Sequence, residues 1–157
     1  MATVTKAGIF ILWLLKQAGE AYRYGAEYPL LQEDLANPYA FPKADEWDCS
    51  ELVQGGLWAA GVTHVGTLRL QSFDGAGNQY FNSRPISMDV AWKTPGALVF
   101  VQDRGSYPNK PGGVGHVGVV ICQDHCIEAR GTKYGVVLSR RVDRSFNIAS
   151  KVDALYE

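Results

Sequence analysis

The residue of this sequence best suited to nucleophilic chemistry is Cys49. It follows Asp48 in the run Asp48-Cys49-Ser50-Glu51, whose Asp-x-x-Glu spacing predicts a helix-capping box with Asp48 as the N-cap. Cys49 is then the first helical residue, where unpaired backbone N–H groups and the helix dipole favour a thiolate. A thiolate in this position could attack a carbonyl carbon. The alternative is a small buried apolar cysteine without chemistry.

A nucleophilic thiolate needs a base, and the sequence offers His64, His116 and His125. His116 begins a run in which every second residue over 117–121 is apolar, which predicts a strand with that face toward the core. His116 then lies on the opposite face, where Gly118 leaves room beside the imidazole. His64 and His125 are expected in exposed loops. The alternation therefore favours His116 as the base.

Glu128 is the expected partner of the histidine. If Cys122 and Cys126 flank a three-residue hairpin turn, Cys126 and Glu128 share the strand face of His116. A carboxylate in that position accepts a hydrogen bond from the imidazole and fixes its tautomer. The alternative is an exposed strand glutamate. The residues predict Cys49 as nucleophile, His116 as base and Glu128 as the group that orients the base.

Helices are expected before strands along the chain. A first helix, capped by Thr3 or Thr5 and stopped at Gly19, is expected to be nearly buried all round. The second helix begins at Cys49 and is closed by Gly61, and its Gly55-Gly56 pair predicts a close packing contact. Five strands are predicted at 98–101, 117–122, 126–129, 135–142 and 151–156. This order indicates an α+β fold with N-terminal helices packed on a central antiparallel sheet.

Two other segments lie between these predicted elements. The residues from Tyr22 to Trp47 contain three prolines and several aromatic residues, which predicts a long loop with at most a helical turn. Residues 66–82 are predicted to form a glycine-rich turn region. Neither segment shows a repeat or a low-complexity composition.

Composition narrows the class of protein. A length of 157 residues favours a single domain that comprises residues 1–157, with a hydrophobic core that needs no disulfide bond or bound metal to be stable. The net charge of -1 and the lack of a basic run argue against nucleic-acid binding. The nine-residue apolar run Ala7 to Leu15 is too short to insert stably in a membrane, and it has the length of a signal-peptide core without a convincing cleavage site. Three cysteines exclude a disulfide framework.

Two short motifs carry no function in this context. Gly113-x-Gly115-x-x-Gly118 matches a dinucleotide fingerprint, but it follows a loop and opens a strand, which inverts the required context. Cys122, His125 and Cys126 have the spacing of metal ligands, but they lack a fourth ligand. A cross-strand cysteine pair, buried or disulfide-bonded, explains the two cysteines more simply. We expect no metal ion and no cofactor.

Five motifs in order resemble the NlpC/P60 family of papain-like cysteine peptidases, and the resemblance covers most of the chain. Asp48-Cys49-Ser50-Glu51-Leu52-Val53 is similar to the D-C-S-G-L-V nucleophile motif, and Gly115-His116-Val117-Gly118-Val119-Val120 to the G-H-V-G-I-Y base motif. The remaining matches are Pro95-Gly96-Ala97-Leu98-Val99-Phe100 to P-G-D-L-V-F, Ile127-Glu128-Ala129 to I-H-A, and Ala21-Tyr22-Arg23-Tyr24-Gly25 to P-Y-x-x-G-G.

The resemblance implies an activity and further site residues. The family mostly cuts the peptide stems of bacterial cell walls, next to the γ-D-glutamyl residue. Tyr22 takes the place of a tyrosine beside the oxyanion, which the Cys49 N–H also binds. Asp48, Ser50 and Tyr24 are candidates for substrate contacts. The resemblance also favours a packed helix over a signal peptide for the run Ala7 to Leu15.

Departures from the family pattern leave alternatives open. Ala26, Glu51 and Ala97 replace residues outside the catalytic roles, whereas Glu128 replaces the usual histidine in the orienting role. The order Cys-His-Glu also occurs in the related CHAP amidases. Two other hypotheses stay open. One is an acyltransferase that uses the same Cys and His, and the other is an inactive wall-binding or virion module.

The absence of a convincing signal suggests a place of action. We expect a monomeric bacteriophage lysin or tail-associated hydrolase, which acts on the wall after release from the host cytoplasm or from a virion.

Overall fold

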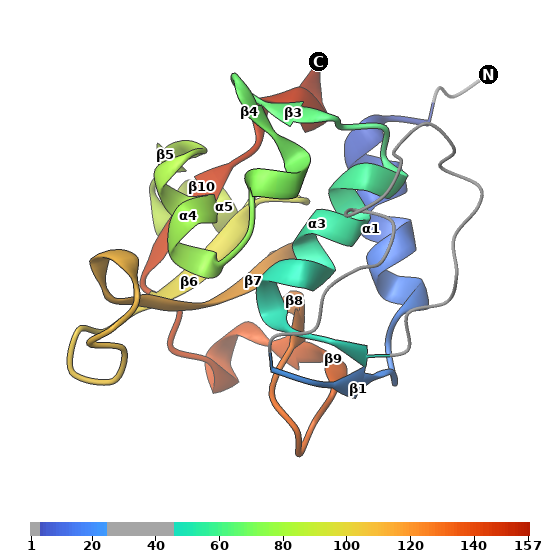
Figure 1. Cartoon of the computed structure of the whole chain (residues 1–157). Helices are drawn as coiled ribbons and strands as arrows, with labels where there is room; N and C mark the ends of the chain where they lie inside the picture. The colour runs from blue at the N-terminus through green and yellow to red at the C-terminus, as the bar shows by residue number, and fades with distance from the viewer. Residues whose placement is uncertain (1–3, 25–45) are drawn as a thin grey trace.

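The computed structural model describes residues 4–24 and 46–157. The expected loop between Tyr22 and Trp47 lies almost wholly outside these residues, including Ala26 and the aromatic residues Tyr28, Tyr39 and Phe41. The first described element is the helix α1 (Lys6–Lys16), and the helix α3 (Cys49–Ala59) follows the undescribed segment. In Figure 1 these two helices lie side by side on one face of the main sheet.

Within the described residues the main sheet has six strands, and each neighbouring pair is antiparallel. Their order across the sheet is β5-β10-β6-β7-β8-β9. The bounds are β5 Arg84–Ile86, β6 Leu98–Gln102, β7 Val114–Cys122, β8 His125–Ala129, β9 Val136–Arg140 and β10 Ile148–Lys151. The expected α+β fold, with N-terminal helices on a central antiparallel sheet, is confirmed.

Helix α3 begins where the sequence predicted. The Asp48 side chain accepts a hydrogen bond from the Glu51 N–H at 2.8 Å, so Asp48 is the N-cap and Cys49 the first helical residue. The glycine pair within the helix does mark a close contact. A Cβ on Gly56 would lie 2.7 Å from the Phe10 ring, and one on Gly55 would lie 2.7 Å from Trp13. The two glycines therefore let α1 approach α3 closely.

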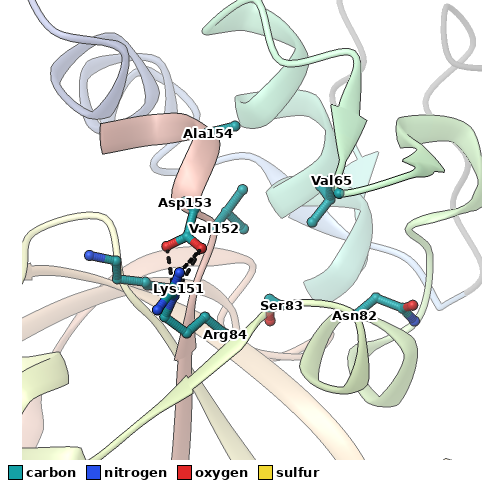
Figure 2. A pocket seen from close by; sticks show the side chains of 9 residues that line it. Val65, Asn82, Ser83, Arg84, Lys151, Val152, Asp153 and Ala154 are labelled. Carbon is teal, nitrogen blue, oxygen red and sulfur yellow. Dashed lines mark hydrogen bonds and ion pairs between the residues drawn. The ribbon is translucent and has the colours of Figure 1, made fainter. Parts of the chain in front are cut away.

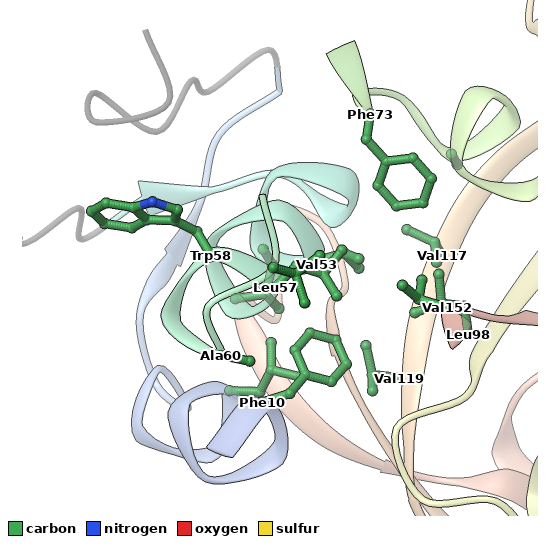
Figure 3. Packing of buried hydrophobic residues seen from close by; sticks show 14 of the residues in the cluster. Phe10, Val53, Leu57, Trp58, Ala60, Phe73, Leu98, Val117, Val119 and Val152 are labelled. Carbon is green, nitrogen blue, oxygen red and sulfur yellow. The ribbon is translucent and has the colours of Figure 1, made fainter. Parts of the chain in front are cut away.

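The core between the helices and the sheet is apolar and closely packed. Figure 3 shows side chains of α1 and α3, among them Phe10, Val53 and Leu57, facing Val117 and Val119 of β7. All five are at most 1% exposed. At roughly 25 cal/mol per Å² of buried apolar surface, the burial of these side chains stabilises the packing of α3 against β7.

The opposite face of the sheet is also covered. A second buried cluster joins Trp92 of the helix α5 (Met88–Trp92) to Val99, Val120 and Cys126 of the central strands. The alternation of apolar residues predicts which side chains lie on each face of β7. It does not predict that both faces are buried. The strand face that carries His116 is therefore sheltered from water along part of its length.

The first helix corrects one expectation. Thr5 is its N-cap and accepts a hydrogen bond from the Gly8 N–H at 3.0 Å. Its buried residues are Phe10 and Leu14, four positions apart, whereas Leu12 is 57% exposed. The prediction of a helix buried nearly all round is wrong, because only one side of α1 packs on α3 and the other side faces solvent.

The second half of the chain contains further differences. The residues predicted as a last strand, 151–156, form the 3-10 helix η4 (Asp153–Tyr156), and the strand β10 ends at Lys151. The predicted glycine-rich turn region contains the helix α4 (Ala76–Phe81), which packs on β7. These elements are too short for a periodic pattern to reveal them.

No helix within the two described ranges has the length and hydropathy to cross a bilayer. The single domain over 1–157 and the monomeric state stay predictions.

Candidate active site

Cys49 lies at the point where two distant segments meet the start of α3. The short strands β1 (Ala21–Tyr22) and β2 (Glu46–Trp47) pair in parallel, with Tyr22 opposite Trp47. This pairing places Tyr22 beside the chain that leads into Cys49. The first N–H groups of a helix have no acceptor within the helix, so the N–H of Cys49 is suited to bind a negative oxygen.

Strand β1 is held in place by the edge of the sheet. The N–H of Val136 donates to the Glu20 carbonyl at 2.8 Å, and the N–H of Gly19 donates to the Val136 carbonyl at 2.9 Å. Gly135 has φ +64, and a Cβ there would lie 2.3 Å from the Glu20 carbonyl oxygen. A glycine is therefore needed for the chain after α1 to reach the sheet and bring Tyr22 to the site.

His116 and Glu128 form a direct pair. The distance between His116 Nε2 and Glu128 Oε1 is 2.7 Å, and Glu128 is 1% exposed. The Cys49 thiol is a further hydrogen-bond partner of the imidazole. Burial acts to lower the pKa of His116, but the hydrogen bonds to Cys49 and Glu128 outweigh it and raise that pKa to about 9. The structure thus brings the three predicted residues together, whereas their catalytic roles stay predictions.

The charge of Glu128 fixes the tautomer of the histidine. Burial acts to raise the pKa of Glu128, but the hydrogen bonds from His116 and Arg144 lower it to about 2. An ionised carboxylate can only accept, so Nε2 of His116 carries the proton that faces Glu128. The other ring nitrogen, Nδ1, is then the one that can take a proton from Cys49.

Two residues that the sequence did not indicate complete this arrangement. Arg144 donates to both oxygens of Glu128, with Nε at 3.1 and 2.9 Å and Nη2 at 2.6 Å. The Phe146 ring stacks on the His116 ring at 5.8 Å with 17° between the planes. The guanidinium of Arg144 lies 5.3 Å from the centre of the Phe146 ring. Both residues lie on the segment after η3 (Arg141–Asp143), and together they hold the imidazole and the carboxylate.

The turn between β7 and β8 differs from the expected one. Cys122 pairs with His125 across a two-residue turn, and the register shifts at Ile121 so that Val120 pairs with Cys126. Without the shift, the pairing from Cys122 onward would place Glu128 opposite Val119, on the core face. The bulge at Ile121 therefore returns Glu128 to the face of His116.

The cysteines of this hairpin are not a cross-strand pair. Cys122 is exposed and lies 3.6 Å from His125 Nδ1, whereas Cys126 is buried and donates to Glu128 Oε2 at 3.5 Å. Burial, followed by the charge of Glu128, raises the pKa of the Cys126 thiol. All three cysteines of the chain are unpaired, so the expected cysteine pair is wrong because the bulge and the short turn change the register. Among the described residues, no three His, Cys, Asp or Glu side chains gather as a metal site would require.

A cleft of about 320 Å³ opens at Cys49. One wall comes from the start of α3, and a second from Gly75 and the first turn of α4. Gln79, fully buried, ties these walls together by donating to the carbonyls of Ser50 and Phe73 at 2.9 and 3.0 Å. The described lining residues are Tyr22, Tyr24, Asp48, Cys49, Ser50, Glu51, Asp74, Gly75, Ala76, Gly77, Asn78, Lys110, Pro111, Val114 and Gly115.

The predicted oxyanion and substrate residues all line this cleft. Burial, followed by the nearby Cys49 and Asp48, raises the pKa of Tyr22 to about 12, so its hydroxyl stays protonated as a donor. Ser50 donates to Asp48 at 3.2 Å, which engages both side chains in the helix cap. Tyr24 is 74% exposed at the rim and accepts a hydrogen bond from Lys110. Their contacts with a substrate stay predictions.

A second hollow of similar size, about 340 Å³, lies elsewhere (Figure 2). It is lined by residues of β5 and of the chain around η4, and an ion pair between Arg84 and Asp153 at 2.8 Å lies in it. Arg84 is exposed and Asp153 is partly exposed, and among the described lining residues there is no cysteine or histidine. The chemistry therefore points to the cleft at Cys49 and not to this hollow.

Comparison with known proteins adds the fold family. No sequence-family profile and no curated protein sequence matches the chain. Several solved structures, in contrast, do match the chain. The peptidoglycan hydrolase RipB from Mycobacterium tuberculosis matches with a TM-score of 0.62 and 22% identity, over 94% of this chain and 64% of that one. NlpC2 from Trichomonas vaginalis matches with a TM-score of 0.65 and 18% identity, over 97% of this chain and 48% of that one.

A third structure names the domain type. RipD from Mycobacterium tuberculosis, described as a non-catalytic NlpC/p60 domain protein adapted to peptidoglycan binding, matches with a TM-score of 0.63 and 18% identity, over 94% of this chain and 97% of that one. The chain has the NlpC/P60 fold. It spans about two thirds of RipB and half of NlpC2. Within this NlpC/P60 fold, the residues around Cys49 decide what the chain can do.

Proposed function

We propose that this chain is a cysteine peptidase or amidase that hydrolyses an amide bond in the peptide stem of bacterial peptidoglycan, next to the γ-D-glutamyl residue. The observation that carries the proposal is the buried His116–Glu128 pair beside Cys49, at a helix N-terminus that opens into a cleft. A nucleophile, a base and a group that orients the base are the three parts that covalent amide hydrolysis requires. The likeness to RipB, whose description names a peptidoglycan hydrolase, supports the substrate class.

The geometry supports the following mechanism. The Cys49 thiolate attacks the scissile carbonyl carbon, and the negative oxygen that forms is bound by the Cys49 N–H and the Tyr22 hydroxyl. The His116 imidazolium gives its Nδ1 proton to the leaving amine as the C–N bond breaks. Water, deprotonated by His116, then hydrolyses the thioester and returns the thiolate. Glu128 keeps the imidazolium oriented in both steps.

The decisive experiment replaces the nucleophile. Cys49→Ala should lower the hydrolysis of purified cell walls by at least about 10³-fold, because loss of a nucleophile removes the covalent path. The matched control is Cys122→Ala, which removes an exposed cysteine outside the cleft and should hydrolyse walls like the parent. Circular dichroism checks the fold, turbidity follows lysis, and mass spectrometry of the new termini identifies the bond. Lysis by a folded Cys49→Ala protein comparable to that of the parent would contradict the mechanism.

A second candidate function is a binding module without catalysis, as RipD is described. In that case the parent would bind walls but release no new termini. An acyltransferase would instead pass the acyl group to an added amine in preference to water, which the same mass spectra detect. The phage origin and the place of action stay predictions.

A further inference from the structure

One cation stands among the charged groups that line the described part of the cleft. Lys110 lies at the end of the loop between β6 and β7, just before η2 (Pro111–Gly113). The other charged lining residues are the acids Asp48, Glu51 and Asp74. The described lining thus combines one ammonium group with three carboxylates. A ligand that bears a carboxylate would find its charge partner at Lys110 alone among these groups.

The ammonium group of Lys110 is held in place at the cleft. Its Nζ donates to the Tyr24 hydroxyl at 2.8 Å and lies 5.0 Å from the centre of the Tyr24 ring. The hydrogen bond to Tyr24 raises the pKa of Lys110, burial opposes this, and the charges of Tyr24, Cys49 and Asp48 add to it. Lys110 and Cys49 line the same cleft, so the ammonium group and the nucleophile face the same ligand space. A lysine held in this way loses less side-chain freedom when it binds an anion.

The loop that carries Lys110 is itself fixed on both sides. Asp103 accepts hydrogen bonds from the N–H groups of Gly105 and Ser106 at 3.0 and 3.3 Å, which closes the turn after β6. On the other side, Gly77 of α4 leaves room for the loop, because a Cβ there would lie 2.7 Å from the Pro111 carbonyl oxygen. In Figure 1 this loop, drawn in yellow to orange, projects beyond the end of the sheet. The position of Lys110 is therefore set by the fold.

We propose that Lys110, held by Tyr24, binds a free carboxylate of the stem peptide next to the scissile amide. This inference rests on the proposed function and names the charge that the substrate must carry. The carboxylate has two sources in such a peptide, the α-carboxyl group of the γ-linked glutamyl residue and a carboxyl group on the residue that follows it. Amidation of the group that Lys110 binds removes the charge and leaves an amide that pairs poorly with an ammonium ion.

The test uses four synthetic stem peptides with the same sequence, in which neither, one, the other or both of these carboxyl groups are amidated. The parent should cleave the peptide with the free carboxylate that Lys110 binds about 10- to 100-fold faster in kcat/KM than its amidated counterpart, mainly through KM. Comparison of the two singly amidated peptides identifies which carboxyl group is bound. Equal kcat/KM values for all four peptides would overturn the inference.

Charge variants of the lysine separate a specificity role from a structural one. Lys110→Gln should bring the ratio of carboxylate to amide substrates close to one, and Lys110→Glu should reverse it. A merely structural role would lower kcat/KM for both substrates equally and leave the ratio unchanged. The matched control is Lys133→Glu, which makes the same charge change in an exposed lysine that lies 5.3 Å from the Tyr134 ring and outside the cleft lining. It should keep the parent ratio.

The failure of the inference and the failure of the proposed function give different results. If the parent cleaves none of the peptides, the proposed function fails, and calorimetric titration of the same peptides then decides the role of Lys110. Tighter binding of the carboxylate form, lost in Lys110→Gln, would support the inference for a binding module. Equal affinities for the two forms would overturn it.

Discussion

Arg144→Met is the substitution whose effect follows most directly from the structure. Arg144 makes three hydrogen bonds to the Glu128 carboxylate, which is 1% exposed, while His116 makes one. The pKa of Glu128 falls from 4.5 to about 2 in spite of burial, which corresponds to about 3 kcal/mol in favour of the charged form. Methionine keeps much of the side-chain volume but removes the charge and all three hydrogen bonds.

The expected loss of stability depends on pH. Because folding lowers the pKa of Glu128, its contribution is fully present above pH 4.5 and is lost as pH falls through 2. Because folding raises the pKa of His116, this residue contributes fully to the free energy of unfolding below pH 6.5, and the contribution is lost as pH rises through 9. At pH 6 both groups are charged in the folded protein. Arg144→Met should then lower the free energy of unfolding by about 2 to 3 kcal/mol at pH 6, and by about 1 kcal/mol at pH 3.

Urea unfolding, followed by tryptophan fluorescence at the two pH values, measures this difference. The matched control is Arg140→Met, which breaks the exposed ion pair between Arg140 and Asp143 in the adjoining segment and should leave stability nearly unchanged. Two results would refute the claim that Arg144 keeps Glu128 charged. One is an Arg144→Met protein as stable at pH 6 as the control, and the other is an equal loss at pH 3 and pH 6.

Two further predictions concern the proposed catalytic residues. Because the pKa of His116 is about 9, its imidazolium persists at pH 6.5, so iodoacetamide should alkylate Cys49 more than about tenfold faster than the exposed Cys122, and His116→Ala should slow the alkylation of Cys49. Equal rates in the parent, read by peptide mass spectrometry, would contradict a thiolate–imidazolium pair. Glu128→Gln keeps an acceptor without charge and should retain part of kcat/KM for a stem peptide, whereas Glu128→Ala should lose at least about tenfold more. Parent-like activity in Glu128→Ala, with an unchanged His116 titration by NMR, would show that another group orients the base.

The part of this molecule that the sequence determines is local. The start of α3 follows from the spacing of Asp48 and Glu51, because a cap needs only residues within one helical turn. The alternating residues of β7 likewise assign His116 to the face opposite the helical core, since neighbouring side chains of a strand point to opposite sides. Short elements such as α4 and β5 stay hidden, because they contain too few residues for a period to emerge.

The assembly of the site depends on contacts between residues distant in sequence. The pairing of β1 with β2 brings Tyr22 to Cys49, and the approach of the chain after η3 supplies Arg144 to the buried Glu128. The strand face on which Glu128 lies depends on the bulge at Ile121. The three-residue turn expected from the sequence predicts the same face for Glu128, but through a different register between the two strands. No local spacing encodes these contacts, because each forms only when tertiary packing has brought the two distant partners together. The sequence by itself thus determined which groups could react, and the tertiary structure decided which groups hold them in place.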